Sequence, residues 1–406
     1  MSGSAGQAGV RLTTIAREWG RIGCIGFGGP PTHIALLRRL CVEERKWLAP
    51  NEFEDAIAAT NLLPGPASTQ LAIYSAWRLR GTAGALVGGV CFIVPGLVVI
   101  LGLAAFFLSG GVPRWALGAA AGAGAAVAAV AVHAGVGLAP ASWQRAGTAR
   151  AARLRWIGYL LAGGLAAALT GPWLVLVLVA TGVLEVVVRT GIPGRSTSVS
   201  APLPLAITLP ALGGLAAVSW VAFKVGALSY GGGFVIIPLM QSDAVTHYHW
   251  MTDAQFLNAV ALGQITPGPV VQTVAAVGYA AAGLPGGLLA ALVAFAPSFL
   301  FILCGGRYFD RLRTNPRVLA FLSGAGPAVI GAILGSAIPL TLALQYTWQF
   351  AVLAAAALWL VAARRGVVGT LLSAAAIGVA AAAFDLPITW EIPSARPAGT
   401  PGDVQV

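Results

Sequence analysis

Nine long apolar runs constrain what this chain can fold into, because each contains 14 to 27 residues. A membrane helix needs about 20 apolar residues, so the shorter runs would need help from their flanks. No run alternates with the period of a barrel strand, which leaves helices as the structure that can span a membrane. Only 9% of the residues are charged, against about 25% in soluble domains. The sequence therefore predicts an all-α polytopic membrane protein. The runs are Thr82–Leu108, Trp115–Leu138, Trp156–Leu169, Trp173–Val188, Leu205–Phe223, Gly286–Cys304, Val318–Leu344, Phe350–Ala363 and Val367–Phe384.

The rest of the composition points away from other protein classes. Arg17, Glu18 and Arg21 interrupt the apolar core that a cleavable signal peptide would need. The four cysteines are scattered without a CxxC pair, so we predict neither a disulfide framework nor a metal site. We find no catalytic triad, phosphate-binding loop or nucleic-acid motif, and predict no cofactor.

Two copies of one pattern lie 203 residues apart. The segment FGGPPTHIALLRRLCVEERKW (Phe27–Trp47) aligns with YGGGFVIIPLMQSDAVTHYHW (Tyr230–Trp250), and the same shift superposes two Pro-Gly-Pro segments. Unrelated apolar stretches would share leucines and alanines by chance, but not glycine pairs, a valine, a tryptophan and Pro-Gly-Pro at one spacing. We therefore predict a duplication. Its predicted parts are a first repeat at 11–194, a linker at 195–204, a second repeat at 205–386 and a flexible tail at 387–406.

Basic residues indicate that the two copies cross the membrane in opposite directions. Arg45 and Lys46 precede Trp47, whereas the loop around Trp250 has no lysine or arginine. Farther along, only Arg114 follows the first long helix, whereas several arginines follow the second. Because cytoplasmic loops collect Lys and Arg, equivalent loops are predicted on opposite sides, as in the inverted repeats of many secondary transporters. The other cations predicted to be cytoplasmic are Arg145, Arg150, Arg153, Arg155, Arg189, Arg195, Arg364 and Arg365.

Each Pro-Gly-Pro segment is predicted to be the tip of a re-entrant helical hairpin. About 30 residues separate the basic clusters that flank the first segment, and two full spans would need roughly 40. Half-length helices over Asn51–Leu63 and Ala67–Leu79 fit instead, with the tip near the bilayer midplane. A plain kinked hairpin that packs neighbouring helices is the alternative. Two tips that enter from opposite faces would meet.

Polar groups around the tips predict an anion site. The helix that begins at Ala67 presents free N–H groups, and the hydroxyls and amides of the two tip segments add donors. Arg21 and Lys224 align in the two copies, each within an apolar stretch, although snorkelling to the interface is the simpler alternative. The net charge of +11 fits either a positive-inside bias or an affinity for anions. The predicted substrate-binding residues are Arg21, Lys224, Gly28, Gly29, Gly231, Gly232, Asn61, Pro64, Gly65, Pro66, Ser68, Thr69, Gln264, Pro267, Gly268 and Pro269.

Three titratable residues are candidates for ion coupling, namely Glu18, Asp55 and His33. Asp55 has no acidic counterpart in the second copy, but a solvated helix face explains it more simply. His33 follows the first glycine pair, where a lone histidine more often packs or caps than carries a proton.

The chain resembles the chromate ion transporter family in its long two-domain form. The resemblance runs from Leu12 to Phe384 and is carried by the two glycine-pair, valine, tryptophan and Pro-Gly-Pro patterns. It implies export of chromate from the bacterial cytoplasm across the inner membrane, driven by the membrane potential or the proton gradient. Two departures touch the predicted site, because Gly26 stands where a serine like Ser229 is expected and Asn61 replaces a longer amide.

Several alternatives remain beside chromate export. Sulfate or another tetrahedral oxyanion would suit the same donors. A membrane enzyme acting on lipid or phosphate substrates would need an acid or nucleophile cluster, and a structural membrane protein would lack a polar centre. The predicted partners are an oxyanion and the lipid bilayer, without nucleic acid, and a homodimer is left open.

Overall fold

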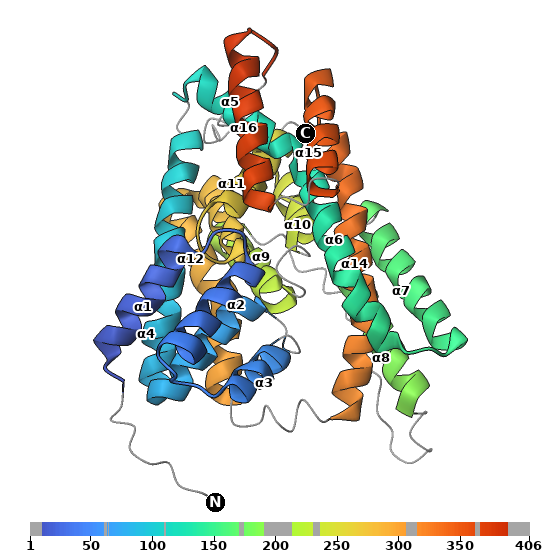
Figure 1. Ribbon diagram of the computed structural model, residues 1–406. Helices are drawn as coiled ribbons and strands as arrows, with labels where there is room; N and C mark the ends of the chain where they lie inside the picture. Colours follow the sequence, from blue (N-terminus) through green and yellow to red (C-terminus); the bar gives the residue numbers. More distant parts are fainter. Residues whose placement is uncertain are drawn as a thin grey trace, which may run out of the picture.

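A computed structural model describes residues 10–60, 63, 65–108, 111–169, 174–190, 213–229, 236–305, 315–361 and 366–388. In these segments all regular structure is helical and no strand is present (Figure 1), which confirms the all-α prediction. Among the described residues, four helical stretches are long and apolar enough to cross a membrane. The chain is therefore a multi-pass membrane protein. The four stretches are Ala67–Leu108, Arg114–Ala146, Val270–Gly305 and Pro316–Leu342.

The helices follow a similar order in both halves, with α5 and α6 of the first half at the place of the single helix α14 in the second. In the first half they are α1 (Leu12–Ile25), α2 (Pro30–Arg38), the π-helical turn η1 (Arg39–Glu44), α3 (Pro50–Thr60), α4 (Ala67–Leu108), α5 (Arg114–Ala125), α6 (Val127–Ala146), α7 (Arg150–Leu169) and α8 (Leu174–Thr190). In the second half they are α9 (Gly214–Leu228), α10 (Ile236–Gln241), the π-helical turn η3 (Ser242–His247), α11 (Asp253–Ile265), the 3₁₀ turn η4 (Val270–Gln272), α12 (Thr273–Gly305), α14 (Pro316–Leu342), α15 (Thr347–Val361) and α16 (Val367–Ala383).

Large apolar side chains cover the outside of these helices. Leu292 on α12 is 70% exposed, Val98 on α4 is 64% exposed and Leu358 on α15 is 67% exposed. Water would penalise such a surface by about 25 cal/mol for every Å² of apolar area. Lipid tails do not, so these helix faces are the ones that contact the bilayer.

The duplication seen in the sequence recurs in the backbone. The two π-helical turns begin at residues 203 apart, and each is followed by a residue with positive φ, Lys46 at 51° and His249 at 54°. Helix α4 loses helical geometry at Arg80 and Gly81, and α12 does so at the equivalent Ala282 and Gly283. The break in α4 falls where the sequence predicts one helix to end and the next to begin.

The two halves are interleaved rather than packed as separate bodies. Helices α7 and α8 from the first half pack on α14 from the second, whereas α15 and α16 pack on α5 and α6 (Figure 1). Helix α4 packs on α12 between α1 and α9. The predicted domain limits remain a prediction, but the packing means that neither half buries its own helices alone.

A buried carboxylate fixes one of these shared contacts. Glu185 on α8 accepts hydrogen bonds from Arg155 Nε at 2.8 Å, Arg189 Nε at 2.7 Å and Tyr159 Oη at 3.1 Å. A Cβ placed on Gly324 of α14 would lie 2.7 Å from Glu185 Cβ. The ion-pair network therefore joins α7 and α8 beside a contact of α8 with α14.

Candidate functional site

The two Pro-Gly-Pro segments make the same contact in both halves. The N–H of Gly65 donates to the carbonyl of Ser229 at 3.0 Å, and the N–H of Gly268 donates to the carbonyl of Gly26 at 3.0 Å. Both glycines have positive φ, 120° and 94°, a conformation that a side chain would strain. Ser229 and Gly26 end the first helices of their halves. Each segment is thus bound to the opposite half.

Buried polar atoms without a partner gather around these segments. The atoms Thr69 Oγ1, Ser229 Oγ, Gln264 Nε2, Gln272 Oε1 and Ser298 Oγ have no hydrogen-bond partner among the described residues. Buried polar groups in native proteins are almost always hydrogen-bonded to protein, water or ligand. Ser298 lies on α12 at 3.3 Å from the place where Gly65 would carry a Cβ. This polar centre can therefore receive water or a polar ligand.

Helix α4 lines the polar centre at the second segment. Gln272 Nε2 donates to the carbonyl of Ile93 at 2.8 Å. A Cβ on Gly96 would overlap the carbonyl oxygen of Pro267, so α4 approaches the segment as closely as its backbone allows. The sequence analysis did not single out Gly96 or Ser298. They align with each other in the duplication, since each follows an equivalent proline.

His33 is held by hydrogen bonds on both ring nitrogens. Its Nε2 lies 2.9 Å from the carbonyl of Gly26 and its Nδ1 lies 3.2 Å from Ser68 Oγ. A carbonyl only accepts, so Nε2 carries the hydrogen, and Nδ1 of the neutral ring accepts from the Ser68 hydroxyl. A Cβ on Gly26 would be 2.6 Å from the ring. The ring therefore occupies the space that a side chain at position 26 would need. This explains why glycine stands at position 26, where the equivalent residue of the second half is Ser229.

Both predicted cations have carboxylate partners. Arg21 is 55% exposed and lies 3.2 Å from Glu18, which also binds Arg17 and Arg45. Lys224 is 19% exposed and its Nζ lies 2.6 Å from Asp243 Oδ2. Neither pair repeats in the other half, because valine and leucine stand at the positions equivalent to Glu18 and Asp243. The carboxylates reduce the net positive charge that these two cations offer.

The remaining predicted residues divide into four groups. Pro66, Pro267 and Pro269 are buried in the two segments. Gly29 precedes α2, and a Cβ there would lie 3.6 Å from Val270, whereas Gly28 is exposed. Asp55 is on an exposed face of α3. Asn61, Pro64, Gly231 and Gly232 lie outside the described residues.

One cavity adjoins the first segment and contains a cation that the sequence analysis placed in a loop. It has a volume of about 210 Å³, and Gly65, Ala67 and Arg145 are among its lining residues. Arg145 lies in the last turn of α6 at a helical spacing from Leu138 and Ala141, which line the same cavity. That spacing is the sequence signal that could have placed Arg145 on the helix face toward the cavity.

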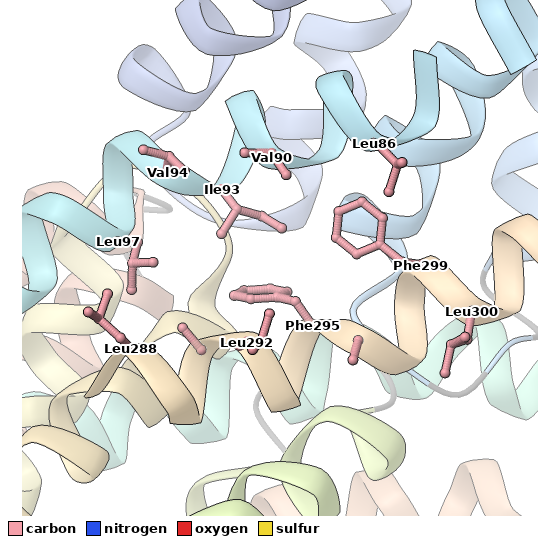
Figure 2. Close-up of a pocket in the computed structure, with 12 residues that line it drawn as sticks. Leu86, Val90, Ile93, Val94, Leu97, Leu288, Leu292, Phe295, Phe299 and Leu300 are labelled. Carbon is pink, nitrogen blue, oxygen red and sulfur yellow. The ribbon is translucent and has the colours of Figure 1, made fainter. Parts of the chain in front are cut away.

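A larger groove between α4 and α12 has a different character. Figure 2 shows Phe295 and Phe299 of α12 facing Ile93 and Leu86 of α4 across it. Its volume is about 540 Å³ and all its lining residues are apolar. A desolvated anion would find no side-chain donor there. The groove therefore suits lipid rather than a polar ligand.

In the segments that the structure describes, no group of three His, Cys, Asp or Glu side chains could hold a metal ion. Long apolar helices that surround a buried polar centre define the class, a multi-pass helical membrane protein with an internal polar site. The family model named Chromate transporter matches residues 13–186 and 216–382. The chain belongs to the chromate transporter family, a family of membrane transporters.

Named relatives agree with this assignment. The chromate transport protein of Cupriavidus metallidurans is 33% identical over 333 residues, which cover 79% of this chain and 80% of that protein. The probable chromate transport protein of Synechococcus elongatus is 29% identical over 348 residues, 81% of this chain and 84% of that protein. The chromate transport protein of Pseudomonas aeruginosa is 30% identical over 336 residues, 79% of each chain. No solved structure matches the chain.

Proposed function

We propose that this protein is a secondary transporter that exports chromate, or a related tetrahedral oxyanion, from the cytoplasm across the inner membrane. The observation that carries the proposal is the cluster of buried polar atoms at the two Pro-Gly-Pro segments. The relatives named chromate transport proteins supply the class of anion. Chromate and sulfate are both tetrahedral dianions, so the same donors suit either.

The proposed architecture is a pair of inverted repeats with a re-entrant hairpin in each. Three observations support it: the loop charges of the sequence, the recurring backbone breaks, and the reciprocal hydrogen bonds of Gly65 and Gly268. Such repeats in transporters place the substrate at their interface near the membrane midplane. Alternating access would move one group of helices against the other and expose the site to each side in turn.

The anion would be held mainly by neutral donors. Thr69, Ser229 and Ser298 can rotate their hydroxyls toward an oxygen, and the Nε2 of Gln264 is a further donor. Arg21 and Lys224 would contribute electrostatic attraction from the flanking helices α1 and α9, weakened by their carboxylates. Glu18, Asp55 and His33 remain the candidates for proton coupling. The energy source is the membrane potential or the proton gradient.

Transport into sealed vesicles tests the proposal. Purified protein in proteoliposomes should move labelled chromate, and sulfate, molybdate and phosphate in excess should reveal the selectivity by competition. A potassium diffusion potential and a pH jump, applied separately, should show which gradient drives the flux. Folded protein that moves none of these anions faster than empty vesicles would refute the function.

Variants in the same assay test the site. Ser298→Ala and Thr69→Val each remove a buried hydroxyl and should weaken anion binding by about tenfold, the effect of one hydrogen bond to a charged group. Arg21→Ala should lower the transport rate less, and so should Lys224→Ala combined with Asp243→Asn, which leaves no unpaired carboxylate. Unchanged transport in all four variants would contradict the assignment of the site.

A further inference from the structure

Two equivalent glycines have unlike surroundings in the two halves. Gly124 and Gly326 are 202 residues apart, the shift that also aligns Pro95 with Pro297. A Cβ on Gly124 would lie 2.7 Å from Asn258 Oδ1 of α11. A Cβ on Gly326 would have only Ser142 Oγ within 4 Å among the described residues, at 3.8 Å. Helix α11 of the second half is therefore closed onto α5 of the first half, whereas α3 stands away from Gly326 on α14.

The cavity beside the first segment fills the space that this separation leaves. Gly326 lines it together with Thr60 and Leu63 at the end of α3 and Gly65 and Ala67 of the first segment. Three of the residues equivalent to its walls in the other half are buried by 97% or more, namely Val127, Ala128 and Leu340. The cavity thus marks the half in which the path to the polar centre is open.

Arg145 is the cation of this open half. It lines the cavity, is exposed, and has no ion pair with any carboxylate in the described part of the chain. Thr347 stands at the equivalent position, so the cation is present in one half only. A guanidinium presents several N–H donors in a planar fork, which suits two oxygens of a tetrahedral oxyanion better than an ammonium does.

Asp55 on α3, which would face the cavity if α3 closed, carries the charge opposite to that of Arg145. Asp55 is the equivalent of Asn258, 203 residues earlier. If α3 closes on α14 as α11 closes on α5, Asp55 reaches Gly326, on the cavity wall that Arg145 shares. Helix α3 packs mainly on α4, whereas α11 packs on α4, α5, α12 and α16. Fewer contacts therefore have to break for α3 to move.

We propose that Arg145 binds the tetrahedral oxyanion in the open cavity, and that Asp55 replaces the anion as the partner of Arg145 when α3 closes. The proposal rests on the proposed function and deepens it. It assigns the binding cation to α6, in place of Arg21 and Lys224. It also makes release of the anion a direct exchange of one ionic partner for another.

Anion affinity tests the role of Arg145. We expect Arg145→Gln to raise the KM for chromate export by about 10- to 100-fold, the effect of losing hydrogen bonds from a charged donor. Arg145→Lys should recover part of the loss. Arg150→Gln is the matched control, because Arg150 is an exposed arginine at the start of α7 and does not line the cavity. Equal KM values for Arg145→Gln and Arg150→Gln, in a wild-type protein that transports chromate, would overturn the inference and leave the proposed function standing.

A cross-link tests the closure without depending on transport. In a chain whose four native cysteines are replaced, Ala58→Cys on the exposed face of α3 and Ala141→Cys in the cavity wall retain both Asp55 and Arg145. We expect the pair to cross-link in membranes and saturating molybdate, which oxidises thiols less readily than chromate does, to suppress the cross-link. Adding Asp55→Asn should lower cross-linking in the absence of anion. A cross-link that never forms, or that ignores both molybdate and Asp55→Asn, would contradict the exchange of partners.

Discussion

A methyl group at Gly96 should separate α4 from the second Pro-Gly-Pro segment. The Cβ of Gly96→Ala would overlap the Pro267 carbonyl oxygen and Gln272 Oε1, and would lie 2.9 Å from Gln272 Nε2. The side chain of Gln272 can rotate, at the loss of its bond to Ile93, but a main-chain carbonyl cannot move without the segment. Overpacking of this kind costs about 1–3 kcal/mol.

Replacing glycine by alanine also stabilises a helix, so measuring the overpacking cost of Gly96→Ala needs a control substitution within α4. Alanine in place of glycine stabilises a helix interior by about 1 kcal/mol. Gly102 lies on the same helix with no atom within 4 Å of its added Cβ. Gly102→Ala should therefore show the helix stabilisation without any overpacking. The difference between the two variants is then the overpacking term, about 1–3 kcal/mol. A displacement of the segment by about 1 Å should also lower the transport rate by about 100-fold, as misplaced binding groups do.

Two measurements check the prediction. Tryptophan fluorescence during heating in detergent gives the unfolding temperatures, and chromate flux in proteoliposomes gives the rates. Gly96→Ala should unfold at a lower temperature than Gly102→Ala and should transport more slowly. If the two variants unfold together and transport at the wild-type rate, the close approach of α4 does not position the segment.

Three further substitutions separate structural from functional roles. Gly26→Ser should displace the His33 ring and reduce transport. Adding His33→Ile should restore transport, because the two substitutions reproduce Ser229 and Ile236 of the second half. A double variant that transports no better than Gly26→Ser would refute this. Lys224→Gln should destabilise the fold by about 3–5 kcal/mol, since it leaves the buried carboxylate of Asp243 unpaired, and Asp243→Asn in the same chain should recover most of that loss in thermal unfolding. Glu185→Gln should lower the unfolding temperature by weakening the bonds from its two arginine partners, and an unchanged temperature would mean that the network does not hold α8 in place.

Much of the local structure could be predicted from the sequence. Long apolar runs require helices in lipid, and prolines and glycines disrupt them at defined residues. The break at Arg80 and Gly81 and the start of α4 at Ala67 were predictable for this reason. The orientation of the halves and the depth of the segments remain predictions, because they rest on loop charge and segment length.

The partners of the helices could not be predicted in the same way. Helix α7 packs on α14 through glycines, and a Cβ on Gly331 would overlap the Leu160 carbonyl. Glycine and alanine are spread over nearly every run, so their positions do not reveal which helix approaches which. The sequence analysis also took Arg145 for a loop residue, because the positive-inside rule accounts for any cation near a helix end. The ion pairs that Glu18 and Asp243 make with Arg21 and Lys224 could not be predicted either, because helix packing decides which side chains meet.

The differences between the halves limit where ion coupling can occur. If the two repeats were identical, the state open to one side of the membrane would be equivalent to the state open to the other side. Each titratable group would then have a copy in the same surroundings in the other state. A proton that is bound in one state and released in the other therefore requires a titratable group without a titratable counterpart. Glu18 aligns with Val221, His33 with Ile236 and Asp55 with Asn258. Of these, His33 makes hydrogen bonds through both ring nitrogens and Glu18 binds three arginines, and Asp55 lies on α3, the helix whose end borders the cavity. The carboxylate that would exchange with the anion is thus one of the three groups without a titratable copy, and it lies on the helix that is proposed to move.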